Sequence, residues 1–399
     1  MAAALDARWK AAAYKTSTFP GLAADALARS EAHRAYDAGA LADWILSARS
    51  YPPACNPFGP QGPPAFTVWA NDRFVVNIYA YNTPEVLIHD HNFPGAFVNA
   101  AGQTVHCTFR FDVAERIDPN LRVGALQVAG IERIDVGDVR RIEPGPGFIH
   151  QVWHLSIPTV VVVVRTRALP RRAVRQFEYL RPAVAVEILR DDVNDFPAQK
   201  FRYTRKMLQT LRASGSCVDD LTRVIQTERS WAAVWHLIEN WPFLAASGAL
   251  EDVIARGAER HGQWFTAMKT VAPRVAVFHL MDWQRVVLES DRIVLALLMT
   301  MDSWPSIART LQTLVPGASP DGLVIDSLRR LGEQRISPLV LAEGQLGILH
   351  CALRSHGQPR EFTRLVRRTF DIDTTEQLRW ARQAERELHQ HELLRPLLN

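Results

Sequence analysis

The sequence is poor in cysteine, and its few cysteines form no metal-binding or disulfide pattern. Cys55, Cys107, Cys217 and Cys351 stand far apart with no CxxC pair, which excludes a disulfide framework and a zinc-finger arrangement. Apolar runs such as Val160–Val164 have the length of a strand, far below the roughly 18 residues that a membrane-spanning helix needs. No apolar stretch typical of a secretory signal follows the charged residues near the start. We therefore expect a cytoplasmic protein with no membrane partner.

A strong excess of one charge is also missing. The chain has 46 basic and 42 acidic residues and a formal net charge of +4, which is too small a bias to indicate a nucleic-acid partner. The sequence contains no Walker phosphate loop, no dinucleotide glycine fingerprint and no GxSxG nucleophile elbow. The sequence therefore has no motif that would indicate a nucleotide-dependent enzyme or an α/β-hydrolase.

The residue types and the spacing of apolar residues change twice along the 399-residue chain. Residues 1–59 have the pattern of short helices followed by a linker rich in proline and glycine. Over 60–190, short runs of Val, Ile, Phe, Tyr and Thr are separated by turn residues, which is typical of a β-sandwich or small barrel. Over 191–399, apolar residues recur at spacings of three and four, which predicts an all-α domain. The expected fold class is α+β multidomain, a β-barrel followed by helices.

Histidines in the predicted barrel form the most informative pattern. His89 and His91 lie two residues apart in a predicted strand, so their side chains point to the same side. His150 closes a glycine- and proline-rich segment in a distant strand. Two imidazoles from one strand and one from another match a facial metal site with open positions for substrate and oxygen. His389 and His391 are also two apart, but a helix turns such side chains away from each other, so we expect no metal there.

The first histidine segment resembles the first motif of the cupins. That motif reads G-x5-H-x-H-x3-4-E-x6-G. This chain has His89-Asp90-His91, three residues, Gly95, six residues and Gly102. The opening glycine of the motif is missing, and Gly95 stands where the motif has its glutamate.

The second histidine segment resembles the second cupin motif, G-x5-7-P-x-G-x2-H-x3-N. This chain has Gly137, then the segment 145–150 ending in His150, and His154 in place of the asparagine. Together the two motifs imply a cupin barrel, which is a double-stranded β-helix, over about 60–190. They also imply that His89, His91 and His150 coordinate one metal ion.

Because the glutamate is missing, the first motif is most similar to one group of cupins. Thiol dioxygenases, which include cysteine dioxygenase, are similar cupins with only three histidine ligands, and Ile88 to His91 followed by Gly95 is similar to their core. This resemblance implies Fe(II) as the metal and O2 as a co-substrate. Imidazole ligands also suit zinc, nickel and manganese, so the residues by themselves leave the metal open.

The residues that orient a substrate have to come from elsewhere, because the strand after His150 lacks the Ser-x-His-x-Tyr triad expected of thiol dioxygenases. Strand alternation puts His106 and Arg110 on one side. We predict that both lie beside the metal and that Arg110 binds a substrate carboxylate. The alternative is a half-exposed strand whose polar face meets water. The remaining candidate catalytic residues are Tyr79, Tyr81 and His154.

Three classes of function remain open. The first is a mononuclear non-haem iron oxygenase that acts on a small carboxylate-, amine- or thiol-bearing metabolite, free or attached to a carrier, as in a biosynthetic pathway. The second is a zinc, nickel or manganese enzyme without oxygen chemistry, such as an isomerase or lyase. The third is a ligand-sensing barrel joined to a helical interaction domain. We favour the first, with a small molecule as partner, no nucleic acid, and homo-oligomer formation left open.

Overall fold

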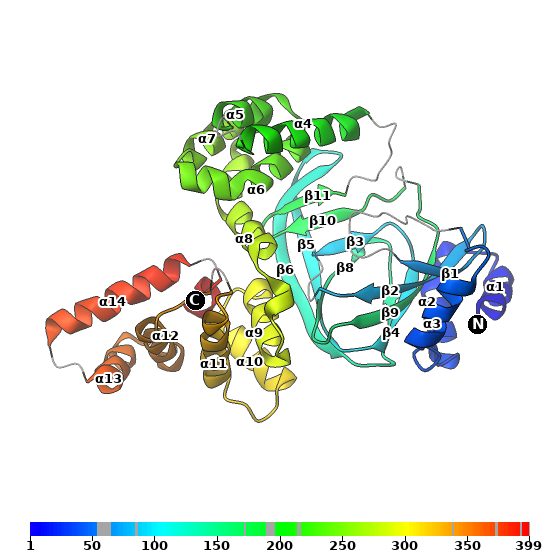
Figure 1. Ribbon diagram of the computed structural model, residues 1–399. Helices are drawn as coiled ribbons and strands as arrows, with labels where there is room; N and C mark the ends of the chain where they lie inside the picture. Colours follow the sequence, from blue (N-terminus) through cyan, green and yellow to red (C-terminus); the bar gives the residue numbers. More distant parts are fainter. Residues whose placement is uncertain are drawn as a thin grey trace. The chain divides into compact units, whose positions relative to one another are not determined.

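The computed structural model describes residues 1–53, 65–83, 87–170, 173–188, 196–213, 217–336, 339–371, 374–391 and 393–398 (Figure 1). The chain divides into two compact units, Met1–Ala276 and Val277–Asn399. The domain boundaries expected at 59/60 and 190/191 lie outside the described residues. Those boundaries therefore stay predictions.

The first unit contains an antiparallel sheet of five strands in the order β1-β2-β9-β4-β7. The strands are β1 (Phe66–Ala70), β2 (Phe74–Tyr81), β4 (Gly95–Ala101), β7 (Val139–Ile142) and β9 (Thr159–Thr166). β1 and β2 form a hairpin, whereas the other neighbours in this sheet are distant in the sequence. This connectivity is that of Greek-key barrels and not of a simple meander.

A second antiparallel sheet closes on itself in the order β10-β11-β6-β5-β8-β3. Its strands are β3 (His89–His91), β5 (Thr104–Asp118), β6 (Leu121–Ile134), β8 (Gly145–His154), β10 (Phe177–Leu180) and β11 (Val184–Glu187). The ring closes where His89 of β3 pairs with Glu178 of β10. Strand β5 is much longer than its neighbour β8, and their last pair is Phe109 with Ile149. Beyond Phe109, β5 pairs with β6.

Strand β9 shows why an uninterrupted apolar run fits this barrel. Val160, Val162 and Val164 pack with the N-terminal helices α1 (Ala2–Ala11) and α2 (Phe19–Arg29). Val161 and Val163 pack on the other side of the sheet against Phe97 of β4. Because both faces of the strand are covered, alternation of apolar and polar residues disappears. A third N-terminal helix, α3 (Ala38–Ser47), starts at Asp37, whose carboxylate accepts a hydrogen bond from the Ala40 N–H.

Helices also follow the barrel within the first unit. They are α4 (Phe196–Ala213), α5 (Val218–Thr227), α6 (Ser230–Ser247) and α7 (Leu250–His261), with the 3-10 turn η2 (Gln263–Ala267). Helix α8 (Met268–Leu280) follows and crosses the division at 276/277. Residues of β6, β10 and β11, among them Leu121 and Val184, share one hydrophobic cluster with Trp231, Leu237 and Phe265 of these helices. This part of the helical region is therefore packed onto the barrel by burial of apolar surface.

The second unit is helical. It holds η3 (Trp283–Arg285), α9 (Glu289–Thr300), α10 (Trp304–Leu314), α11 (Pro320–Glu333), α12 (Glu343–Ser355), α13 (Pro359–Phe370), α14 (Thr375–Gln390) and α15 (Arg395–Leu398). Helix α9 is buried from Asp291 to Thr300, as expected for the central helix of a bundle. Helix α10 has Ser303 at its N-cap and Pro305 in its first turn, where proline is tolerated.

The predicted α+β class is confirmed: a double-stranded β-helix barrel, the cupin fold, is followed by helices (Figure 1). Among the described residues, no helix combines the length and the apolar character needed to cross a membrane.

Candidate metal centre

The three predicted ligands lie together in the barrel. His89 and His91 come from β3 and His150 from β8, and the two strands pair directly at His89 and His150. One nitrogen from each ring lies within 4.8 Å of the others, and the Nε2 atoms of His91 and His150 are 3.0 Å apart. Two nitrogens bound at right angles to one ion at about 2.1 Å would lie about 3.0 Å apart. The spacing of these histidines therefore suits a divalent metal ion.

Hydrogen bonds select the nitrogen that each ring offers. The Nδ1 atom of His89 lies 2.8 Å from the Leu87 carbonyl and donates to it, which leaves Nε2 as the free base. The Nδ1 atom of His150 lies 3.1 Å from Nε2 of His106. In both ligands a fixed Nδ1 contact directs Nε2 toward the shared point.

Burial keeps the three imidazoles neutral. It lowers the pKa of His89, and it lowers the pKa values of His91 and His150 well below the usual range. The neighbouring rings add to the effect at His91 and His150, and Arg165 adds to it at His91. A metal binds the neutral form of imidazole, so these histidines are ready to coordinate at neutral pH.

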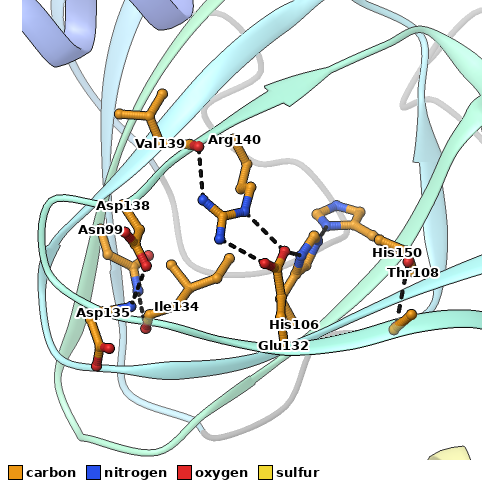
Figure 2. A network of polar contacts seen from close by, with 11 residues as sticks. Asn99, His106, Thr108, Glu132, Ile134, Asp135, Asp138, Val139, Arg140 and His150 are labelled. Atoms are coloured by element: carbon orange, nitrogen blue, oxygen red, sulfur yellow. Dashed lines mark hydrogen bonds and ion pairs between the residues drawn. The ribbon is translucent and has the colours of Figure 1, made fainter.

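A chain of hydrogen bonds leads from His150 to the barrel edge (Figure 2). The Nδ1 atom of His106 lies 3.0 Å from a carboxylate oxygen of Glu132, its partner across β5 and β6. Arg140 donates to both oxygens of Glu132, at 2.9 and 2.7 Å. The bonds from His106 and Arg140 lower the pKa of Glu132 to about 2. The ionised Glu132 accepts from His106 Nδ1, and His106 Nε2 accepts from His150 Nδ1. His150 Nε2 therefore carries no proton and faces His91 Nε2.

Gly95 has a backbone reason to be glycine. A Cβ at this position would lie 2.5 Å from the Val164 carbonyl oxygen and 3.0 Å from the Cα of Arg165. Strands β4 and β9 approach closely here, where Gly95 pairs with Arg165. The position that carries a glutamate in the first cupin motif therefore has no room for a side chain unless the strands separate.

Arg165 is the residue near the centre that sequence reasoning missed. It is 5% exposed and shares a strand face with Val161 and Val163, which line the space between the sheets. Its guanidinium lies 4.6 Å from the ring centroid of Phe93, and that ring lies 4.7 Å from the ring of His91. The alternation of residues 161, 163 and 165 was the available signal, but the apolar run hid it.

The structure corrects the expectation for Arg110. Its side chain is 69% exposed and pairs with Asp112, and it donates to the Gln127 side chain at 2.6 Å. Arg110 follows Phe109, the last residue of β5 that pairs with β8, so it lies beyond the wall that holds His150. A place in the barrel beside the metal is therefore wrong for Arg110, whereas His106 lies in the barrel against His150.

Tyr79, Tyr81 and His154 form a separate cluster. The Tyr81 ring stacks on His154 at 4.2 Å and faces Tyr79 at 6.1 Å. Both tyrosines pack with Phe97 and Val161, and burial raises the pKa of Tyr81 so that its phenol keeps its proton. On β8, His154 pairs with Thr104 whereas His150 pairs with Thr108. This cluster is therefore four residues along the barrel wall from the histidine centre, and a catalytic role for these three residues stays a prediction.

Asp90 faces away from the histidines and holds the closure of the second sheet. Its carboxylate accepts from the Phe177 N–H at 2.7 Å and from the Tyr179 hydroxyl at 2.9 Å. Both partners belong to β10, the strand that joins β3 to complete the ring. Asp90 therefore positions β3 from behind while its neighbours face inward.

Comparisons with known proteins found partial matches to solved structures. No family model and no curated protein matches the sequence. An oxalate decarboxylase from Bacillus subtilis matches with a TM-score of 0.19 and 13% identity over 27% of this chain and 24% of its own. A hydroquinone 1,2-dioxygenase matches with a TM-score of 0.20 and 17% identity over 26% of this chain and 63% of its own. A double-stranded β-helix protein from Klebsiella pneumoniae matches with a TM-score of 0.20 and 13% identity over 35% of this chain and 93% of its own.

The chain spans less than two thirds of the length of the decarboxylase and the dioxygenase. Likeness at this level assigns neither a family nor a substrate. The strand order and the three histidines define the class: a protein with a cupin barrel and a three-histidine site suited to a divalent metal ion.

Proposed function

We propose that this protein is a mononuclear non-haem Fe(II) oxygenase that acts on a small carboxylate-, amine- or thiol-bearing metabolite. The observation that carries the proposal is the convergence of His89, His91 and His150 with Gly95 in the place of a fourth ligand. Three neutral imidazoles leave open positions for substrate and oxygen on a facial site, and they do not neutralise the charge of the ion. An anionic substrate is then favoured beside oxygen. The resemblance of the first motif to thiol dioxygenases supports iron.

When bound, the metal supplies a Lewis acid and a place where substrate and oxygen meet. The residues of the chain do the remaining work. Phe93, Phe97 and Phe148 pack around the histidines, and these apolar rings exclude water from the site. His106 and Glu132 hold the ring of His150 in one tautomer.

Arg165 is the residue of this site that suits a substrate carboxylate. It lies on the inner face of β9 beside Phe93 and His91. A guanidinium binds a carboxylate through two parallel hydrogen bonds, and a water-poor site strengthens that interaction. We propose Arg165, in place of Arg110, as the partner of a carboxylate-bearing substrate.

The test is anaerobic reconstitution of the full chain with Fe(II), followed by metal analysis and by oxygen uptake with a panel of small mercapto- and amino-carboxylates. We expect one iron per chain and oxygen uptake that depends on at least one of these compounds. Stoichiometric zinc, nickel or manganese that supports turnover without oxygen would replace the oxygenase by a non-oxidative enzyme. Absence of any tightly bound metal would contradict both the oxygenase and the non-oxidative metal enzyme.

A matched control separates the site from chance histidine pairs. His389 belongs to a second HxH pair but is exposed on α14. The His389→Ala variant should keep the full metal content and the full oxygen uptake, whereas His91→Ala should lose both.

A further inference from the structure

A polar cavity lies in the first unit, and its lining includes none of the three predicted metal ligands. Its volume is about 550 Å³, and it is bounded by the β5–β6 turn on one side and by the ends of α5, α6 and α7 on the other. Small-molecule sites typically measure roughly 300–1,000 Å³. The barrel and these helices share one hydrophobic cluster, so both walls belong to the same packed body.

Trp231 forms part of the inner wall of the cavity. The residue lines the cavity and is 2% exposed. Its ring belongs to the hydrophobic cluster that joins the barrel to the helices, so this wall is held by packing.

Two arginines at the cavity supply positive charge. The Nε atom of Arg260 donates to the Gln226 carbonyl at 3.0 Å, which leaves the terminal nitrogens of the guanidinium for other acceptors. The Arg229 guanidinium interacts electrostatically with Asp118, and no hydrogen bond joins this side chain to a residue that the structure describes. Both arginines line the cavity, and their combined charge exceeds that of Asp118.

The other charged groups of the lining are already neutralised by close partners. Arg175 donates to Glu187 at 2.6 Å, and Glu228 pairs with Lys200 at 3.0 Å. These pairs add no net charge to the cavity. The surplus of one positive charge therefore comes from Arg229 and Arg260 against Asp118.

A serine–histidine contact fixes the walls. The Ser230 hydroxyl lies 3.1 Å from Nδ1 of His261, and Nε2 of His261 donates to the Ile225 carbonyl at 2.6 Å. These bonds tie the start of α6 to the end of α7 and to α5. The two arginines are the sequence neighbours of Ser230 and His261, so their guanidinium groups are presented from a fixed frame.

We propose that this cavity binds a small organic oxyanion, a carboxylate- or phosphate-bearing molecule, with Arg229 and Arg260 on its charged group. None of its residues belongs to the metal centre. The proposal for this cavity is therefore independent of the proposed oxygenase function, and the two are tested by separate experiments.

The experiment is calorimetric titration of the full chain with two probes, inorganic phosphate and succinate. We expect saturable binding of at least one probe, and the tighter of the two identifies the phosphate-bearing or the carboxylate-bearing class. Loss of a charged hydrogen bond corresponds to about a tenfold or larger rise in Kd. Arg229→Gln and Arg260→Gln should each produce such a rise.

Arg256→Gln is the matched control, because Arg256 lies on the same helix α7, pairs with Asp252 and does not line the cavity. It should leave Kd unchanged, and the same binding should persist in the His150→Ala variant. Two results would overturn the proposal: no binding of either probe up to about 10 mM, or equal weakening by Arg256→Gln and Arg260→Gln.

Discussion

Nε2 of His106 lies 3.1 Å from Nδ1 of His150, and Nδ1 of the same His106 lies 3.0 Å from Glu132. A buried histidine thus stands between a predicted metal ligand and a carboxylate that is held by Arg140 (Figure 2). This geometry leads to the first prediction.

Replacing His106 should weaken metal binding although His106 is not itself a predicted ligand. His106→Leu removes the acceptor for His150 Nδ1–H, and loss of such outer partners typically lowers metal affinity about 10- to 100-fold. Glu132→Gln keeps an acceptor for His106 and should cause a smaller loss. Competition titration with a metal chelator measures both affinities. An affinity of His106→Leu within twofold of the wild-type value would show that the contact does not support the site.

Gly95 should not tolerate a side chain. A Cβ at Gly95 would meet the Val164 carbonyl oxygen at 2.5 Å, so Gly95→Ala should lower the free energy of unfolding by about 1–3 kcal/mol through overpacking. Gly147→Ala is the control, because its nearest neighbour would be an ordinary 3.6 Å away, and its change should stay within about 0.5 kcal/mol. Urea unfolding compares the two. Equal stability of the two variants would contradict the close approach of β4 and β9.

Arg165 should determine affinity for a carboxylate substrate. Loss of a buried charged partner costs roughly 2–5 kcal/mol, so Arg165→Met should raise KM by about 30-fold or more while the metal content stays unchanged. Arg165→Lys should recover part of the affinity, because it keeps the charge but not the paired hydrogen bonds. The exposed Arg110→Met serves as control and should keep the wild-type KM. A KM in Arg165→Met that matches this control would remove Arg165 from the substrate site.

Stability should fall in mild acid because of His236. Burial lowers the pKa of His236 in α6 to about 4, whereas an exposed histidine titrates near 6.5. Between these values the unfolded chain binds a proton that the folded chain does not, so the free energy of unfolding decreases as pH falls through this window. The loss from this residue should reach about 2–3 kcal/mol by pH 4.5.

His236→Phe should remove that part of the pH dependence, and chemical unfolding at pH 7 and pH 4.5 measures it. His389→Ala, on an exposed site, should keep the wild-type dependence. An unchanged pH dependence in His236→Phe would show that this imidazole is not buried in its neutral form.

The sequence was sufficient for the histidine centre but not for the residues around it. His89, His91 and His150 follow from short motifs whose spacing is local. Strand alternation put His106 on the same side as Arg110 but did not determine whether that side faces the barrel or water. Arg110 has the same alternation, but its environment depends on where β8 ends, which is a property of long-range pairing. Arg165 was missed for a related reason, since a strand covered on both faces gives no polar signal that separates its two sides.

The central claim is that three histidines hold one metal ion, and the most direct measurement is iron per chain in protein reconstituted anaerobically, compared between the wild type and His150→Ala. The account predicts one Fe(II) per wild-type chain and loss of most of the iron in His150→Ala, with the fold intact by circular dichroism. Full iron occupancy in His150→Ala would contradict the assignment of the third ligand and with it the site.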